Sequence, residues 1–314
     1  ENVGYEFDLT GHIINKKDYS LDLNVNGEII ENRITEMPLD PATGNQQVLN
    51  GVLSVGRSIF DFYAREWAGV DPSDGAPMWY QYYDDVNNNG VFDATEPTSG
   101  ANSWIPADAD VTNASGSIVE YQQVVPGANI KKRVTKSYSE ASEVYLNKSG
   151  IADIRGAFRL TGRVKDFTFS TQFTYSLGGY AYDAQYGELM SDRFGAVGNN
   201  FSKDISNRWT TPGQITDVPR LADGADQNAT SYSSRFVTST DHLALNNVNV
   251  NYNVPSKYLE GKGLETLSLW MSADNLFMNT ARRGFLPTTS ESGSSGRQLY
   301  APMTTITLGL RLKF

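Results

Sequence analysis

Oxygen-bearing side chains between Asp85 and Glu96 have the spacing of a cation-binding loop. The segment fits the pattern D-x-[DN]-x-[DN]-G-x5-E without a mismatch, and Gly90 stands where the pattern needs a sharp turn. This spacing lets alternate oxygen atoms converge on one point, which suits a hard cation such as Ca²⁺. The expected ligands are five side chains and one backbone carbonyl, from Asp85, Asn87, Asn89, Val91 (the carbonyl), Asp93 and Glu96.

A second interpretation of this loop stays open. Neither Tyr82-Tyr83 before it nor Pro97 after it resembles the flanking helices of an EF-hand, and only three of the ligands are carboxylates, so a calcium site here is expected to be weak. The alternative is an Asx-rich loop whose side chains cap their own backbone. A structural Ca²⁺ is the one cofactor that the sequence indicates.

Two further sets of residues are candidates for contact with a solute or with a partner surface. The polar face of one predicted strand carries Arg155, Arg159 and Arg163. These side chains are candidates for contact with an anionic solute or an acidic partner surface, and the alternative is a polar face that contacts only water. Trp270 also falls on a polar face, where it stacks on a sugar ring, packs against a partner domain or joins an interfacial aromatic girdle.

Composition excludes several classes of protein. The chain has no cysteine among its 314 residues, which excludes disulfides and thiol chemistry. A net charge of −10 argues against a nucleic-acid partner, which requires a basic field. No Ser-His-Asp set, GxSxG motif or assignable pair of catalytic carboxylates stands out, so we expect no enzymatic activity and no catalytic residues. No apolar run reaches the roughly 20 residues of a membrane helix.

The elements that must position these residues are strands of period two. In the last eleven residues one face carries only apolar side chains, namely Ile306, Leu308, Leu310, Leu312 and Phe314. Apolar residues on one face and polar residues on the other, over roughly 9–11 residues, are typical of a strand that crosses a membrane. A half-buried strand of a soluble domain gives the same local pattern, so the other strands must decide.

The connections between strands alternate in length. Paired strands flank short turns at 15–18, 163–166 and 255–263, whereas long polar stretches cover 27–150, 179–240 and 281–300. Outer-membrane barrels have short periplasmic turns and longer extracellular loops, so the pattern predicts an all-β, antiparallel transmembrane barrel with long extracellular loops. We expect the apolar faces to form one continuous outward band, the three short turns to lie at one rim, and a bulge to occur at Asn246-Asn247.

The stretch 27–150 is too long for one structureless loop. Its aromatic-rich segments Val55–Trp67 and Pro77–Tyr83 are predicted to form a further pair of strands, and Gln122–Val134 is predicted to add a ribbon above the membrane. The expected strand count is therefore eight to ten.

Several segments, in order along nearly the whole chain, resemble the C-terminal third of the SusC/RagA-type TonB-dependent outer-membrane transporters. The similar segments are Val55–Tyr63 with Ala68–Pro72, Asp85–Gly90, Phe167–Gly179, Arg208–Gly213 with Pro219-Arg220, Leu245–Pro255, Ala273–Phe277 and the terminal aromatic. Each motif is weak alone, but their shared order makes them jointly specific.

The resemblance implies a 22-stranded barrel filled by an N-terminal plug, of which residues 1–314 are the C-terminal portion, with the plug absent from this chain. It also implies a multi-pass protein of the cell outer membrane that imports a large nutrient, an oligosaccharide or peptide, by plug opening driven by TonB. The implied partners are TonB, through the missing N-terminal part, outer-membrane lipid and a SusD-like surface lipoprotein that lids the barrel, with a dimer of the transporter–lipoprotein pair as a further arrangement. Phe314 would be the residue read by the assembly machinery.

The chain begins Glu1-Asn2-Val3, directly inside a strand pattern, and we expect it to be a piece of a longer protein. It cannot close such a barrel alone, because open strand edges are not tolerated in lipid. A calcium-stabilised surface binding module or adhesin is the alternative function.

Overall fold

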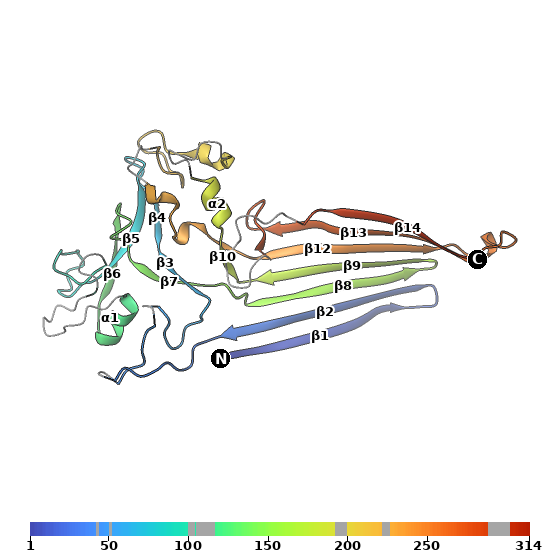
Figure 1. Cartoon of the computed structure of the whole chain (residues 1–314), viewed down its shortest axis with the longest axis horizontal. Helices are drawn as coiled ribbons and strands as arrows, with labels where there is room; N and C mark the ends of the chain where they lie inside the picture. The colour runs from blue at the N-terminus through green and yellow to red at the C-terminus, as the bar shows by residue number, and fades with distance from the viewer. Residues whose placement is uncertain are drawn as a thin grey trace.

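A computed structural model describes residues 1–41, 44–49, 52–99, 104, 117–191, 200–221, 227–287 and 302–314. Its largest element is a seven-stranded antiparallel sheet in the order β1-β2-β8-β9-β12-β13-β14, whose long strands run horizontally in Figure 1. These strands are β1 (Asn2–Asn15), β2 (Tyr19–Asn32), β8 (Ile154–Val164), β9 (Phe167–Leu177), β12 (His242–Asn253), β13 (Thr266–Thr280) and β14 (Thr305–Lys313).

The short turns of this sheet lie at one end. The turns between β1 and β2, between β8 and β9 and between β12 and β13 are all at the right of Figure 1, near the C-terminus, and the long connections are at the left. The prediction that 15–18, 163–166 and 255–263 share one rim is confirmed. In the part of the chain that the structure describes, no helix is long and apolar enough to cross a membrane.

One face of the sheet is apolar across its strands. The register aligns Leu9 with Val25, Val25 with Phe158, and Phe158 with Phe173. It continues from Phe173 through Leu245 to Phe277. The rings of Phe158 and Phe173 stack at 4.6 Å. The apolar band predicted from the alternation is therefore continuous, and side chains of the opposite parity form a polar face.

The bulge predicted at Asn246-Asn247 is also present. The register shifts between Leu245 and Asn247 against both β9 and β13, so one residue of β12 is unpaired. That extra residue keeps Leu245 and Val248 on the same face although their parities differ. A strict alternation would have turned half of β12 the wrong way.

A glycine accommodates the one indole ring on the polar face of the described sheet. Trp270 on β13 pairs with Gly309 on β14, and a Cβ at Gly309 would lie 2.3 Å from the Cε2 atom of Trp270. The ring therefore lies directly against the backbone of β14. Close packing of this kind leaves no room for a larger side chain.

We expect Gly309→Val to destabilise the sheet by about 1–3 kcal/mol, because the added methyl groups must displace the Trp270 ring. The measurement is urea unfolding of the full-length protein, folded in lipid and followed by tryptophan fluorescence. Thr307→Val is the matched control, because Thr307 lies opposite Ser272 on the same strand and face. Equal unfolding midpoints for both variants would contradict the packing.

The remaining described strands and helices belong to the long connections. We call residues 33–153, 178–241 and 281–287, in so far as they are described, the loop assembly. Its elements are β3 (Asp61–Arg65), β4 (Trp67–Val70), β5 (Pro77–Asp84), α1 (Ile118–Val124), β6 (Ile130–Thr135), β7 (Glu143–Ser149), β10 (Tyr180–Tyr182), α2 (Ala184–Leu189) and β11 (Val237–Ser239), with short 3₁₀ turns at Lys203–Asn207, Gln227–Thr230 and Ser234–Phe236. A fourth 3₁₀ turn, Ser256–Tyr258, lies in the β12–β13 turn.

The expected count of eight to ten strands in the main sheet is wrong for the described residues, which form seven. The segments 55–67 and 77–83 contribute to two small sheets, β3-β7 and β4-β5-β6, instead of to the main sheet. Their aromatic residues are buried within the loop assembly, as Phe62 and Trp79 show. Gln122–Val134 forms the end of α1 and most of β6, which pairs with β5, so this segment does not form the predicted ribbon by itself. Its position above the membrane stays a prediction.

Small apolar cores hold the loop assembly together. Trp104, Ile118, Tyr121 and Val144 form one cluster, in which α1 packs near β7. A second cluster joins Met190, Val218 and Phe236, which come from three separate parts of the connection between β9 and β12. The loops are thus packed structures that can position side chains over the end of the sheet. The region 281–300 lies outside the described residues beyond 287.

Candidate functional site

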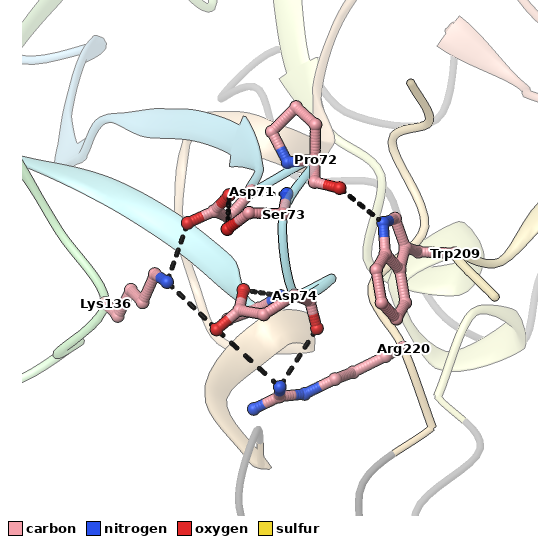
Figure 2. A network of polar contacts seen from close by, with 8 residues as sticks. Asp71, Pro72, Ser73, Asp74, Lys136, Trp209 and Arg220 are labelled. Carbon is pink, nitrogen blue, oxygen red and sulfur yellow. Dashed lines mark hydrogen bonds and ion pairs between the residues drawn. The ribbon is translucent and has the colours of Figure 1, made fainter. Parts of the chain in front are cut away.

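The turn between β4 and β5 joins two of the long connections (Figure 2). Trp209 donates from its Nε1 atom to the carbonyl of Pro72 at 3.0 Å, and the backbone N–H of Gly213 donates to the same carbonyl at 2.7 Å. Arg220 donates to the carbonyl of Asp74 at 2.9 Å. We call this contact between 71–75 and 209–220 the loop clamp.

The clamp depends on a close approach at Gly75. This residue has a φ of +75°, and a Cβ there would lie 2.4 Å from the Cε3 atom of Trp209. Only glycine adopts this backbone conformation without strain and also leaves room for the indole. Both halves of the clamp carry motifs by which the sequence resembles the transporter family, and the structure brings them together.

Charged groups complete the clamp. The Nζ atom of Lys136, just past β6, lies 2.6 Å from Asp71 and 3.0 Å from Asp74 (Figure 2). The hydrogen bonds from Lys136 and from Ser73 lower the pKa of Asp71, and the backbone N–H of Ala76, followed by Lys136, lowers the pKa of Asp74. Both pKa values are lowered on folding, so the two ionised carboxylates stabilise the folded state. This contribution to the free energy of unfolding is present above about pH 4 and is lost as the pH falls further.

We expect Gly75→Val to release the segment 203–220 from the turn while the main sheet stays folded. The added side chain meets the Trp209 ring and also forces strain at a positive φ, which together cost about 1–3 kcal/mol. The measurement is limited proteolysis of the folded full-length protein, with cleavage sites identified by mass spectrometry.

Gly213→Ala is the matched control for that prediction. Gly213 has a φ of +90° but has open space around its missing Cβ, so this variant isolates backbone strain from the clash. Faster cleavage within 203–220 is expected for Gly75→Val and only a small change for Gly213→Ala. Identical cleavage patterns in the two variants would contradict the clamp.

A buried ion pair joins the third connection to the second. Asp183 is 1% exposed and accepts hydrogen bonds from Arg282 at 2.9 Å (Nε) and 2.5 Å (Nη2). Its other oxygen accepts the backbone N–H of Tyr186 at the start of α2. The Arg282 guanidinium also lies over the Tyr186 ring at 4.4 Å. Together with the loop clamp, this pair makes the three connections one supported unit.

The loop between Asp85 and Glu96 is wound around its own side chains. Asp85 accepts the backbone N–H groups of Asn89 and Gly90, at 3.0 and 2.9 Å. The side-chain oxygen of Asn87 also accepts from Asn89, and that of Asn89 accepts from Val91 at 2.7 Å. Gly90 takes the sharp turn with a φ of +74°. These bonds are the capping arrangement that the sequence offered as the alternative to calcium.

The two ends of this loop are buried next to each other. The backbone N–H of Asp84 donates to the carbonyl of Pro97 at 2.9 Å, which brings Asp85 and Glu96 together. Asp85 is 1% exposed and Glu96 is 7% exposed, whereas Asp93 is exposed and its carboxylate accepts from Thr95. Within the described ranges no group of three or more His, Cys, Asp or Glu residues is arranged to hold a metal ion. The backbones at the two ends of the loop therefore lie side by side, with Asp85 and Glu96 both buried, and the three carboxylates of the pattern do not form one group.

The base of the loop is fixed to the α1–β6 connection. The carboxylate of Asp84 accepts the hydroxyl of Tyr121 and the backbone N–H of Asn129, both at 2.7 Å. The side chain of Asn129 donates to Asn88 at 2.9 Å. Burial, followed by the hydrogen bond to Asp84, raises the pKa of Tyr121, so the phenol stays protonated as a donor.

The arginines of β8 have partners within the sheet. Arg155 forms an ion pair with Glu28, Arg159 donates to Gln172 at 2.7 Å, and Arg163 donates to the carbonyl of Lys17 at 2.8 Å. They lie on the polar face, as expected from the parity. Trp270 shares that polar face. Contact of Arg155, Arg159 or Trp270 with a plug or a substrate stays a prediction.

Neither the loop clamp nor the Asp183–Arg282 pair was predicted from the sequence. The residues of each are separated by many positions, and no local pattern joins Asp74 to Arg220 or Asp183 to Arg282. The available signal was the DPSDG turn after β4, whose Asp, Pro and Gly residues mark a tight turn. Its partner could be identified only from the fold.

Comparisons with known proteins bear on this fold. No family model matches the chain. It is 30% identical, over an alignment 331 positions long, to TonB-dependent receptor P39 of Formosa agariphila and 25% identical to TonB-dependent receptor P3 of the same organism. Each alignment covers 100% of this chain, and 30% and 29% of the respective relatives, so the chain spans about a third of their length.

Solved structures show the same fold. The RagAB peptide transporter matches with a TM-score of 0.69 at 22% identity, over 100% of this chain and 29% of that one. The RagAB peptide importer in its open-open state matches with a TM-score of 0.68, again at 22% identity, over 100% of this chain and 28% of that one. None of these names describes an enzyme, in agreement with the expectation of no catalytic role.

A long antiparallel sheet with one apolar face, short turns at one rim and packed loops at the other is part of an outer-membrane β-barrel. Within that class, the chain corresponds to the C-terminal part of a SusC/RagA-type TonB-dependent transporter. The family resemblance that its motifs suggested is thereby confirmed.

Proposed function

We propose that this chain is the C-terminal barrel portion of a transporter that actively imports a large nutrient, a peptide or an oligosaccharide, across the outer membrane. The observation that carries the proposal is similarity over the whole chain to receptors named TonB-dependent, combined with a sheet whose apolar face suits lipid. A multi-pass outer-membrane location follows from the proposal.

The remaining strands and a plug would come from the rest of the protein. Seven strands in an open sheet leave two unpaired edges, at β1 and β14, which lipid does not tolerate. A 22-stranded barrel also needs a plugged lumen. The polar face with Arg155, Arg159 and Trp270 would then line that lumen and face the plug or the solute.

The proposed partners act at the two ends of the barrel. TonB would pull on the plug from the periplasmic side, where the short turns lie. A SusD-like surface lipoprotein would lid the other end and contact the loop assembly, with two transporter–lipoprotein pairs forming a dimer. The support is the packing of the loop assembly, since the loop clamp and the Asp183–Arg282 pair hold its surfaces in fixed positions.

The substrate class is the finer part of the proposal. Two of the similar solved structures are titled as a peptide transporter and a peptide importer, which favours a peptide. The test is growth of the source bacterium with the full-length gene deleted, on a peptide mixture or an oligosaccharide mixture as the sole carbon source. We expect the deletion strain to fail on one mixture and to recover when the gene is restored.

The control for that test is a restored gene that lacks only the segment contacting TonB. It should give normal amounts of protein in the outer membrane but no growth. Full growth with this control, or surface binding of either mixture without any uptake defect, would contradict import. The second result would favour the binding module or adhesin instead.

A further inference from the structure

We propose that the loop from Asp85 to Glu96 is a structural site for Ca²⁺, held by the carboxylates of Asp85 and Glu96 and by neighbouring amide and carbonyl oxygens. The site lies in the loop assembly, away from the polar face of the main sheet. The proposal is independent of what the transporter imports.

A buried oxygen without a partner points to a ligand. Glu96 is 7% exposed; its Oε2 atom accepts the backbone N–H of Asp93 at 2.9 Å, but its Oε1 atom has no hydrogen-bond partner and no contact with solvent. Buried polar atoms are almost always paired, and an unpaired carboxylate oxygen is especially costly. The other oxygen of the same carboxylate is bound to the backbone of Asp93, so the free oxygen lies close to the loop backbone.

A second buried carboxylate shares this region. Asp85 is 1% exposed, and the Asp84–Pro97 hydrogen bond joins the residue before Asp85 to the residue after Glu96. Tyr83 packs edge-to-face against Phe92, which belongs to the loop.

Neither carboxylate forms an ion pair with a described side chain, although the guanidinium of Arg133 lies over the Phe92 ring of the same loop at 3.8 Å. Among the described residues, no Lys, Arg or His nitrogen lies within ion-pair distance of Asp85 or Glu96. Two buried carboxylates without a counter-ion are strongly unfavourable. A bound divalent cation supplies the missing charge and a partner for the free oxygen of Glu96 in one step.

The remaining ligands suit calcium. The side-chain oxygens of Asn87 and Asn89 each accept one backbone N–H group and keep a second lone pair, and the carbonyl of Val91 lies in the same turn. Asp93, which is held by Thr95, would contribute through a water molecule, as this position of such loops often does. Ca²⁺ accepts six to eight oxygens in flexible geometry, whereas Mg²⁺ demands a near-ideal octahedron.

The cation would stiffen the base of α1 as well as the loop. Asp84, next to Asp85, binds Tyr121 of α1 and the backbone of Asn129. Tyr121 in turn belongs to the apolar cluster with Trp104 and Val144. Closing the loop on a cation therefore fixes one wall of the loop assembly.

The test is terbium luminescence with the purified full-length transporter, in which a bound Tb³⁺ is excited through Tyr83 and displaced by Ca²⁺ or Mg²⁺. We expect saturable binding, displacement by Ca²⁺ with a Kd on the order of 10⁻⁴–10⁻³ M, and much weaker displacement by Mg²⁺. Asp85→Asn and Glu96→Gln should each weaken binding by more than about tenfold, since each removes a directly bound charge.

Two controls make the result interpretable. Glu260→Gln removes one charge at the opposite rim and should bind as the parent does. Without added cation, Glu96→Gln should be no less heat-stable than the parent, because it removes an unpaired buried charge. Stabilisation by Ca²⁺ should be seen in the parent and lost in Glu96→Gln. Absence of saturable binding in the parent, or equal binding in the parent and Glu96→Gln, would overturn the proposal.

Discussion

Leu160→Arg is expected to destabilise the inserted barrel by about 2–4 kcal/mol, the cost of a charge at the bilayer midplane on the lipid-facing side of a barrel. Leu160 lies near the middle of β8, with Leu23 of β2 and Thr171 of β9 as its partners on the apolar face. The measurement is the urea midpoint of full-length protein folded into lipid vesicles, followed by its altered electrophoretic mobility when folded.

Thr161→Arg is the matched control, one residue further along the same strand. Thr161 pairs with Asp22 and Ser170 on the polar face. The introduced arginine therefore lies next to the acidic side chain of Asp22 and not in lipid. We expect a change smaller than about 1 kcal/mol for this variant. If both variants lost the same stability, or if Thr161→Arg lost more, the assignment of the two faces would be wrong.

Deletion of Phe314 is expected to remove most of the full-length protein from the outer membrane while leaving the correctly inserted fraction as heat-stable as the parent. Phe314 follows the last residue of β14 and is 80% exposed, so its removal costs little packing. Burial of a phenylalanine in a core stabilises the folded state by about 1.5–3 kcal/mol, and the exposed Phe314 does not provide this stabilisation. A large effect on amount therefore requires recognition during assembly.

The control for the Phe314 deletion is Phe314→Tyr, which keeps an aromatic ring directly after β14. Quantitative immunoblotting of outer-membrane fractions should show near-normal amounts of this variant and a severe loss for the deletion. Normal amounts after deletion would make Phe314 an ordinary strand end.

The main sheet could be predicted from the sequence because membrane strands obey a local rule. In β14 and β9 every second residue meets the same surroundings, so apolar residues recur with period two. The bulge near Asn247 was also visible, since a slip in parity changes which residues are apolar. The end of the sheet at which each turn lies could then be predicted from the length of the turn.

The loop assembly does not obey that rule, which explains the errors there. Phe62 and Trp79 are aromatic because they are buried among other loop residues, and aromatic-rich strands of a small sheet look like membrane strands in sequence. Contacts between distant loops, such as Arg220 with Asp74, leave no local trace. The cation-binding pattern at Asp85 was visible, but the sequence could not show which carboxylates are buried.

The loop assembly links fold to the proposed transport. A barrel rim must present fixed surfaces to a lid although its loops are long, and the clamp at Pro72, the Asp183–Arg282 pair and the loop at Asp85 each tie one connection down. Loss of any one of them should loosen part of the rim and leave the membrane strands intact.

The central claim is that the seven-stranded sheet crosses the outer membrane with its apolar face in lipid. The most direct measurement is spin labelling of single cysteines placed at each residue of β9, Phe167–Leu177, in the full-length protein in lipid. The chain has no native cysteine, so within it each label reports one position. Collision rates with oxygen, which concentrates in lipid, and with a water-soluble nickel complex are compared along the strand. The account predicts oxygen maxima at the odd positions, Phe167 to Leu177, with little access for nickel there. Nickel access at those positions, or the absence of a period of two, would contradict it.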